Sequence, residues 1–277
     1  MNIQLYSHLI DSPGNELFIA EAQARGHKIT LVRPSEVNLV LGHEKSPKPA
    51  VIFTRVGSSA PMSALVKLSC LALRGHKVLN TPQALLKSRN KTLSYACLAS
   101  AGIPIPKTLV LGNSVTATQL KEFSGPPWVL KKAIGTKGQG VCIVDSKRSL
   151  RSVLEMFSQD CDSLLLQEFI EEASGTDTRV VVLGGKAVVA ATRVAQEEDE
   201  FRSNVYLGGK AHTVEITPEM ADIAERATKI LGLHISGVDL LKTKKGYLVV
   251  EVNGSPGLTT SPVLPSAVVD YLETQSL

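Results

Sequence analysis

The first part of the chain alternates short apolar segments with segments of helical periodicity. Apolar runs at 3–6, 29–32, 50–53 and 77–79 predict strands, and helical spacing predicts helices over 16–25 and 62–74. In the first helix, Leu17, Ala20 and Ala24 fall on one face, and Gly26 ends it. Strands and helices that alternate at this length imply a small α/β domain, in which helices cover both faces of a parallel sheet.

Beyond residue 85 the pattern becomes a mixture of hairpins and longer helices. It predicts helices over 83–101, 149–157, 218–231 and 267–272, and strands within 128–132, 142–144, 164–170, 175–182 and 187–191. Thr217 is the expected N-cap of the helix over 218–231, and Gly232 ends it. We therefore expect three units: an N-terminal α/β domain over 1–85, a central subdomain over 86–169 and a C-terminal subdomain over 170–277.

A late hairpin carries the most informative polar residues. Apolar runs at 237–241 and 247–253 flank a short charged turn, so they predict paired antiparallel strands. Asp239 lies on the first strand, and Glu251 and Asn253 lie two residues apart on the second, where an extended chain points both to one face. Oxygen ligands that converge in this way suit Mg²⁺. The alternative is that Asp239 and Glu251 are ordinary polar groups paired with nearby lysines.

A glycine-rich segment lies between two predicted strands of the central part. Gly135, Gly138 and Gly140 would let backbone N–H groups approach phosphates closely. The segment lacks the ending of a P-loop, and a hairpin rather than a helix follows it, so a merely mobile hairpin is the alternative. Lys131, in the apolar strand just before it, needs an anionic partner if it is half-buried.

Two further segments allow a functional or an ordinary interpretation. The apolar run at 164–166, which leads into the acidic pair Glu171 and Glu172, predicts one wall of an adenine slot or simply core. Arg55 follows a predicted strand of the first domain, where open α/β sheets bind ligands, so it is either an anion contact or a surface arginine. The acidic stretch at 197–200 predicts a solvated loop.

Composition narrows the class of protein. The 277 residues are 43% hydrophobic and 20% charged, which is typical of a globular protein, and carry a net charge of +4. Aromatic residues are only 4%, which argues against direct nucleic-acid binding. Four cysteines without paired spacing predict buried thiols in a reducing compartment. No signal peptide or membrane span is expected, so we expect a cytoplasmic protein without a membrane partner.

The order of these residues resembles a known superfamily. The shared features run from Arg55 through Lys91, Lys131, the glycine-rich hairpin, Gln167-Glu168, Asp177-x-Arg179 and Arg202-Ser203-Asn204 to Asp239 and Glu251-x-Asn253-x-Ser255-Pro256-Gly257. Together they resemble the ATP-grasp superfamily. The segments Phe201-Arg202-Ser203-Asn204 and Glu251-Val252-Asn253-Gly254-Ser255-Pro256-Gly257 are similar to its RimK-like branch of α-L-glutamate ligases.

The resemblance implies an ATP-grasp fold of the α/β and α+β classes. A Rossmann-like pre-ATP-grasp domain would precede two α+β subdomains that clasp ATP. The implied enzyme is an ATP-dependent ligase with two Mg²⁺ ions, or Mn²⁺, that joins a carboxylate to an amine through an acyl-phosphate. L-glutamate is the expected amino acid, and a protein C-terminus or a glutamyl-type group is the expected acceptor.

The resemblance also implies a role for each matched residue. Catalytic roles fall on Arg202, Asn204 and Lys131. Nucleotide contacts fall on Lys91, Lys131, Gly135, Gly138, Gly140, Gln167, Glu168, Phe169, Ile170, Asp177 and Arg193. Asp239, Glu251 and Asn253 are the implied metal ligands. Substrate contacts fall on Arg55, Arg193, Arg202, Ser203, Ser255 and Gly257.

Two departures from the branch stand out. Asn90 stands where the branch commonly has aspartate, which leaves the electrostatic partner of Lys91 open. The segment 258–265 lacks the pattern of the ribosomal-protein-modifying members and borders the expected acceptor entrance, as does the acidic loop 197–200, so the acceptor is open. A ligase for another amino acid or for a carrier-protein acceptor is therefore an alternative. A regulatory nucleotide-binding module and a small-molecule kinase on the same scaffold are two others. The sequence does not decide whether the chain forms a homo-oligomer.

Overall fold

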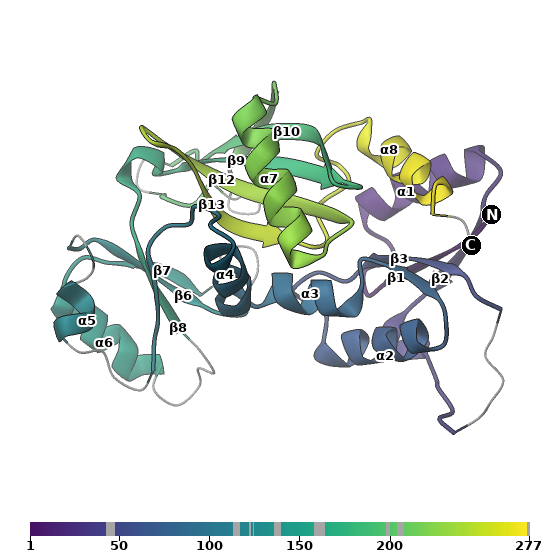
Figure 1. The fold of residues 1–277 in the computed structure, drawn as a ribbon, viewed down its shortest axis with the longest axis horizontal. Helices are drawn as coiled ribbons and strands as arrows, with labels where there is room; N and C mark the ends of the chain where they lie inside the picture. Colours follow the sequence, from purple (N-terminus) through teal and green to yellow (C-terminus); the bar gives the residue numbers. More distant parts are fainter. Residues whose placement is uncertain are drawn as a thin grey trace.

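The computed structural model contains three β-sheets joined by helices (Figure 1). It describes residues 1–42, 48–112, 117–121, 123, 125–135, 140–157, 164–197, 200–203 and 208–275. In the order of the chain, the sheets have four, four and five strands. No helix in these described ranges has the length and apolar character needed to cross a membrane.

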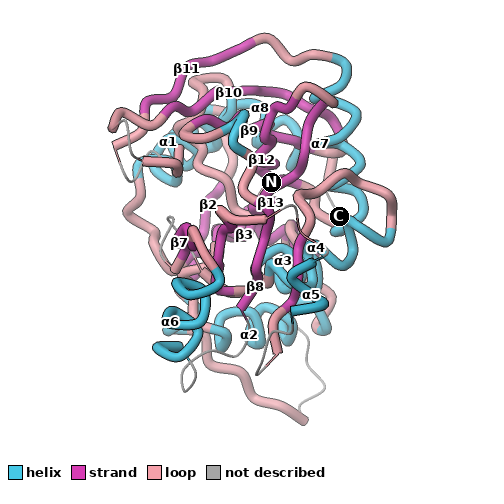
Figure 2. The backbone as a smooth tube through the Cα atoms, turned by 90° about the vertical axis from the view of Figure 1, so that its left-hand side faces the viewer, coloured by secondary structure: helices cyan, strands magenta, loops and turns pink. Residues whose placement is uncertain are grey.

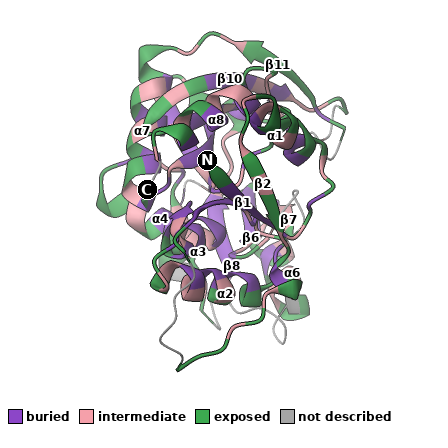
Figure 3. Ribbon diagram, turned by 90° about the vertical axis from the view of Figure 1, so that its right-hand side faces the viewer, coloured by how far each residue is buried: buried purple, intermediate pink, exposed green. Residues whose placement is uncertain are grey.

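The first sheet is parallel, as predicted. Its strands are β1 (Asn2–Ser7), β2 (Lys28–Val32), β3 (Val51–Arg55) and β4 (Lys77–Leu79), in the order β2-β1-β3-β4. Helices α1 (Pro13–Ala24) and α2 (Met62–Leu73) cover opposite faces, because successive strand residues such as Ile52 and Phe53 enter different cores. A short 3₁₀ helix, η1, spans Pro34–Glu36. Strand β1 is buried, whereas β2 at the edge is mostly exposed (Figure 3).

The single helix predicted over 83–101 is wrong: the segment forms two helices, α3 (Pro82–Arg89) and α4 (Lys91–Ser100). Asn90 interrupts them with an extended backbone, at φ −98° and ψ 106°. Its side chain accepts a hydrogen bond from the Leu93 N–H at 3.1 Å and so caps α4. The break puts Lys91 at the first position of a new helix.

The second sheet is antiparallel and lies at one end of the molecule. Its strands are β5 (Thr108–Val110), β6 (Trp128–Lys132), β7 (Val141–Val144) and β8 (Leu164–Glu168), in the order β5-β8-β6-β7. Helices α5 (Ala117–Lys121) and α6 (Lys147–Phe157) lie on its outer side, toward the viewer in Figure 2. Trp128, Leu130 and Leu166 form the core beneath them with Leu150.

The third sheet carries the hairpin that the sequence singled out. Its strands are β9 (Thr176–Leu183), β10 (Lys186–Val194), β11 (Lys210–Val214), β12 (Ile235–Thr243) and β13 (Gly246–Asn253), in the order β11-β10-β9-β12-β13. A 3₁₀ turn, η2 (Glu171–Ala173), precedes it. Helix α7 (Pro218–Leu231) packs on one face with α4, and begins and ends as predicted, with the Thr217 hydroxyl as its cap.

The C-terminal helix α8 (Leu264–Glu273) returns to the first domain and packs on α1 (Figure 1). His27 contacts both the Met1 amine and Glu273, so the end of α8 lies near the N-terminus. One apolar core therefore joins the first sheet, α8 and the remaining face of the third sheet, through residues such as Phe53, Val181 and Val268. Asn80, which follows β4, links the same parts by four hydrogen bonds. Its amide donates to the carbonyls of Ile235 (2.7 Å) and Gly254 (2.6 Å) and accepts from the N–H groups of His234 (2.5 Å) and Ile235 (3.0 Å).

The predicted division at residues 85 and 169 stays a prediction, although the three sheets fall within the three ranges. The cysteine prediction needs a correction. Cys70, Cys97 and Cys142 are free thiols but only half-buried, and Cys161 lies outside the described residues.

Candidate active site

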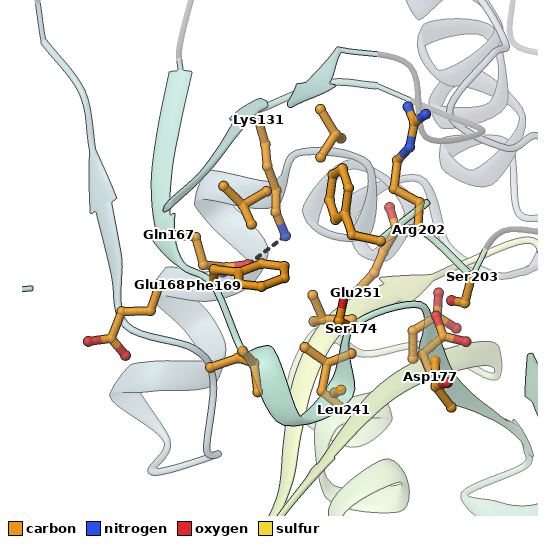
Figure 4. A pocket seen from close by; sticks show the side chains of 18 of the residues that line it. Lys131, Gln167, Glu168, Phe169, Ser174, Asp177, Arg202, Ser203, Leu241 and Glu251 are labelled. Carbon is orange, nitrogen blue, oxygen red and sulfur yellow. Dashed lines mark hydrogen bonds between the residues drawn. The ribbon is translucent and has the colours of Figure 1, made fainter. Parts of the chain in front are cut away.

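A pocket lies between the second and third sheets (Figure 4). Of the residues that sequence analysis assigned to a site, those that line it are Lys91, Lys131, Gly135, Gln167, Glu168, Phe169, Ile170, Asp177, Arg193, Arg202, Ser203, Asp239 and Glu251. These residues come from segments that are up to 160 positions apart, since the first is Lys91 and the last is Glu251. The pocket therefore depends on how the two sheets are placed.

The two carboxylates of the hairpin lie directly opposite each other. Asp239 on β12 pairs with Glu251 on β13, and the register shifts next to this pair, so Val250 is the extra residue of a β-bulge. The Asn253 amide lies 3.4 Å from an Asp239 oxygen and 3.3 Å from a Glu251 oxygen. The predicted convergence of two acids and an amide is thus present. In the described part of the chain, no group of three or more His, Cys, Asp or Glu side chains forms a separate metal site.

Cationic side chains hold both carboxylates. Arg179, opposite Asp239 on β9, donates Nε and Nη2 to its two oxygens at 2.6 and 2.7 Å, and Arg193 Nη2 lies 2.9 Å from Asp239. Burial alone would raise the pKa of Asp239, but the charges and hydrogen bonds of the two arginines hold it below its usual value. Lys91 Nζ lies 2.8 Å from Glu251 and lowers its pKa against burial in the same way.

Arg193 also binds Asp177, its cross-strand partner on β9, through Nε (2.6 Å) and Nη2. Both side chains are buried, and burial together with the charge of Asp239 raises the pKa of Asp177, which Arg193 opposes. Arg193 was predicted to bind nucleotide or substrate. In the structure its guanidinium contacts two carboxylates of the protein and also lines the pocket, and the predicted ligand contact stays a prediction.

Lys131 is buried and its amine faces neutral groups. Its Nζ donates to Gln167 Oε1 at 2.5 Å and lies 3.5 Å from the Tyr95 hydroxyl, and Gln167 in turn donates to Thr108 Oγ1 at 2.8 Å. Burial, and then the charge of Lys91, lower the pKa of Lys131 to about 7, although Glu251 opposes the shift. Among the described residues no carboxylate contacts Lys131 directly, and an anion would complete its environment.

One wall of the pocket is apolar. Phe169 and Phe201 meet edge to face, with ring centroids 6.2 Å apart. The other apolar lining residues are Val129, Val141, Ile170, Ala173, Leu241 and Val250. Figure 4 shows the Phe169 ring at the pocket, whereas the Glu168 carboxylate points away from it. A flat apolar slot beside charged groups suits an aromatic base with attached phosphates.

The sequence predicted a solvated loop over 197–200; Glu197 is exposed, but Glu200 is partly buried in an ion pair. Glu200 binds Arg202 through both oxygens, at 2.8 and 2.6 Å, and Arg202 also lies over the Phe201 ring at 5.6 Å. Ser203, beside them, lines the pocket. The predicted catalytic Asn204, and Glu198 and Asp199 of the acidic segment, lie outside the described residues.

The remaining predicted residues lie away from the pocket lining or cannot be placed. Gly140 adopts φ +71° and would bring a side chain to 3.0 Å from Lys132, so close packing of the hairpin favours glycine. Gly138 is outside the described residues. Arg55, Ser255 and Gly257 are not among the lining residues and gather instead at the carboxyl edge of the first sheet, where Arg55 donates to the Pro256 carbonyl at 2.6 Å.

Sequence analysis gave no role to Arg179 or Tyr95. The Tyr95 hydroxyl, from α4, donates to the carbonyl of the bulged Val250 at 2.5 Å and thereby links Lys131 to the strand of Glu251. Arg179 stands two residues after Asp177, so the alternation of a strand would have placed it on the same face. The sequence around Tyr95 gives no signal for this role, because its contact with Val250 depends on how α4 packs against β13.

The fold is that of ATP-grasp proteins. A RimK domain ATP-grasp protein from Sphaerobacter thermophilus DSM 20745 superposes with a TM-score of 0.76 at 22% identity and covers 98% of this chain and 99% of its own. D-alanine–D-alanine ligase from Bacillus anthracis, complexed with ATP, superposes with a TM-score of 0.71 at 18% identity over 99% and 97%.

The sequence comparison narrows the class further. The family model described as RimK-like ATP-grasp domain matches residues 88–264. A probable alpha-L-glutamate ligase from Legionella pneumophila (strain Corby) is 35% identical over 291 residues, which cover 99% of this chain and 94% of the relative. One from Haemophilus influenzae (strain ATCC 51907 / DSM 11121 / KW20 / Rd) is 34% identical over 91% and 90%. The chain therefore belongs to the RimK-like ATP-grasp family.

Proposed function

We propose that this protein is an ATP- and Mg²⁺-dependent ligase that joins the amine of an amino acid to a carboxylate through an acyl-phosphate. The similar curated proteins are probable alpha-L-glutamate ligases, so L-glutamate is the amino acid that we propose. A peptide or protein C-terminus, or another glutamyl-type group, is the proposed acceptor. The observation that carries the proposal is the pair Asp239 and Glu251, which converges beside Lys91 and Lys131 in a pocket with an apolar wall.

The donor set fits magnesium. Glu251 uses one carboxylate oxygen for Lys91, and only the distant Asn253 amide contacts the other, so lone pairs remain on that oxygen. Asp239 Oδ2 faces donors of Arg179, Arg193 and Asn253, whereas Oδ1 accepts from Arg179 Nε and keeps a lone pair for a metal. These oxygens and the Asn253 side chain would hold Mg²⁺. When bound, the metal neutralises charge on the phosphates. The use of Mn²⁺ and a count of two ions are part of the proposal.

The remaining residues position the reactants. Lys91 and Lys131 lie where they would neutralise the nucleotide phosphates, and the apolar wall around Phe169 would take the adenine. Arg202 would face the oxygens of the acyl group as it is phosphorylated, and would leave Glu200 to do so. Ser203 beside it would orient the substrate, and Asn204 keeps its predicted catalytic role. Most of the catalysis is then positioning and charge stabilisation.

A direct test is incubation with ATP, Mg²⁺, L-glutamate and a panel of acceptors, including peptides that end in glutamate. We expect ADP release that requires both the amino acid and an acceptor, and an acceptor mass that rises by one glutamyl residue. ATP binding without ADP release for any pair would contradict the ligase proposal. ADP release with a stable phosphorylated product and no need for an amine would instead indicate a kinase.

One observation favours a second candidate, a nucleotide-binding module without ligase activity. Glu251 is paired with Lys91, and Asp239 is paired with Arg179 and Arg193, as would be expected if these carboxylates only stabilised the fold. The same assay discriminates, because such a module would bind ATP and release no ADP.

Nucleotide binding should be accompanied by proton uptake. The pKa of Lys131 is lowered to about 7, so above pH 7 most of the free protein carries a neutral lysine. A phosphate beside it favours the charged form, so binding raises this pKa and affinity falls as the pH rises above 7. Calorimetry at pH 8 in buffers of different ionisation enthalpy should detect the uptake in the wild type. Lys131→Arg, which stays charged, should lack this contribution; equal uptake in both proteins would contradict the assignment.

Tyr95→Phe should raise the Mg²⁺ concentration that gives half-maximal activity by about 3- to 10-fold, from the loss of one hydrogen bond. The reason is that the hydroxyl holds the bulged Val250 carbonyl, next to Glu251. Tyr247→Phe, on the same strand but outside the pocket lining, is the matched control. An unchanged Mg²⁺ dependence in Tyr95→Phe would show that the bulge does not need this contact.

A further inference from the structure

Two arginines lie at the carboxyl edge of the first sheet without a carboxylate partner among the described residues. Arg55 ends β3 and Arg89 ends α3. Arg89 is only 8% exposed and Arg55 is half-buried. Their hydrogen-bond acceptors are all neutral. Arg55 donates to Asn15 Oδ1 at 3.1 Å and to the Pro256 carbonyl, and Arg89 Nη2 donates to the carbonyls of Ser58 (3.2 Å) and Ala60 (2.6 Å).

The positive charge at this edge is not compensated. Arg89 Nη1 is buried and has no hydrogen-bond partner. Burial lowers the pKa of Arg55 to about 10 and also lowers that of Arg89, because no acid in contact offsets desolvation. Arg179 and Arg193, in contrast, both bind carboxylates. Two cations and an orphaned donor in one buried region are costly unless an anion joins them.

The two arginines lie against the segment that follows the metal-site strand. A side chain at Gly57, two residues after Arg55, would come within 3.9 Å of the Ser255 side chain. A side chain at Gly254 would meet the Ser88 hydroxyl, next to Arg89, at 2.7 Å. Helix α3, which Arg89 ends, lies between the first sheet and α4 in Figure 1.

The same two segments continue into the pocket. Lys91, two residues after Arg89, binds Glu251, and Asn253 immediately precedes Gly254. An anion held by Arg55 and Arg89 would therefore lie beside the proposed metal site, on the side of the first sheet. The carboxyl ends of parallel strands are also where open α/β sheets bind ligands.

We propose that Arg89 and Arg55 form a binding site for a carboxylate of the incoming amino acid, one that takes no part in the bond being made. This inference rests on the proposed ligase function, and it names the ligand of the two arginines as a carboxylate of the amino acid whose amine reacts. Arg89 offers the orphaned Nη1, and Arg55 supplies the second charge from the opposite side of the junction. A carboxylate on the acceptor is the other possible source of the same chemistry.

The first experiment compares ligands on the wild-type protein. Binding of L-glutamate, L-glutamine and L-glutamic acid α-amide is measured by calorimetry with Mg²⁺ and a non-hydrolysable ATP analogue present. One of the two amides removes the carboxylate that meets the arginines, so it should bind about 10- to 100-fold more weakly than glutamate. Equal binding of all three compounds would overturn the proposal. Because no turnover is needed, glutamate-selective binding without ligase activity would contradict only the proposed reaction.

The second experiment removes the charge. Arg89→Gln should raise the KM for L-glutamate by about 10- to 100-fold and leave the KM for ATP within about 2-fold, since only the carboxylate contact is lost. Arg226→Gln, on the exposed face of α7, is the matched control and should behave as wild type. If Arg89→Gln does not fold, Arg89→Lys is tested instead, because it keeps the positive charge but loses the bidentate donor geometry of the guanidinium. It should raise the KM for L-glutamate by about 3- to 10-fold and leave the KM for ATP unchanged. An unchanged KM for glutamate, or a rise confined to the KM for the acceptor, would overturn the proposal.

Discussion

Glu251→Gln is expected to lower kcat/KM of the proposed ligation by about 100- to 1,000-fold, the typical effect of losing one preorganised charged group at a reacting centre. The substitution keeps the shape of the side chain but removes the charge that faces Lys91 at 2.8 Å and the oxygen that has lone pairs left for a metal. The lost interaction acts on the phosphates, so the Mg²⁺ requirement should rise as well. Initial rates of ADP release at several Mg²⁺ concentrations measure both effects.

The control for this variant is Glu36→Gln, because Glu36 lies on the surface and pairs only with the exposed Arg33. It should retain wild-type kinetics. The thermal midpoint of Glu251→Gln should also stay within a few degrees of the wild type, which would show that the loss of activity does not result from unfolding. Near-normal turnover of a folded Glu251→Gln protein would mean that the carboxylate is only the structural partner of Lys91.

Asn80→Ala is expected to lower the free energy of unfolding by about 4 kcal/mol or more, since several buried polar groups lose their partners at once. Its amide makes four hydrogen bonds with Ile235, Gly254 and His234, and the side chain is completely buried. Alanine restores none of these bonds and leaves the backbone groups at the start of β12 and the end of β13 unsatisfied. Urea denaturation, followed by circular dichroism, gives the value.

Asn2→Ala is the matched control, because Asn2 is exposed and its side chain accepts only a 3.3 Å hydrogen bond from Thr30. It should change the free energy of unfolding by less than about 0.5 kcal/mol, as surface substitutions usually do. A loss of less than about 1 kcal/mol in Asn80→Ala, the size of one ordinary hydrogen bond, would show that water replaces the amide and that Asn80 does not join the sheets.

The parts of the site that sequence predicted best are those with local periodicity. Two apolar runs around a short charged turn predict the hairpin of β12 and β13, and the strand period of two puts Glu251 and Asn253 on one face. The structure adds the register that places Asp239 opposite Glu251. The first sheet follows from the regular alternation of strands and helices, and Thr217, Pro218 and Gly232 mark the ends of α7. In each case the signal lies within single elements and the turns that join them.

The parts that sequence did not predict depend on contacts between distant segments. The sequence pattern placed Asn90 inside one long helix, whereas the structure gives it an extended backbone and a side chain that caps α4 at the Leu93 N–H. Tyr95 reads as a core aromatic, although its hydroxyl reaches Val250 across 155 positions. The ligand contact of Arg193 stays a prediction, but its two carboxylate partners, Asp177 and Asp239, were not predicted. The packing of the sheets determines which charged side chains form ion pairs, so the local sequence pattern does not predict these partners.

The most direct test of the account is a crystal structure of the protein with a non-hydrolysable ATP analogue and Mn²⁺, in which anomalous scattering locates the metal. The account predicts a metal bound by oxygens of Asp239 and Glu251 at about 2 Å, the usual distance for a small divalent cation. It also predicts the adenine against Phe169 and the phosphates near Lys91 and Lys131. A nucleotide bound elsewhere, or one bound here while both carboxylates stay on Arg179 and Lys91 without a metal, would contradict it.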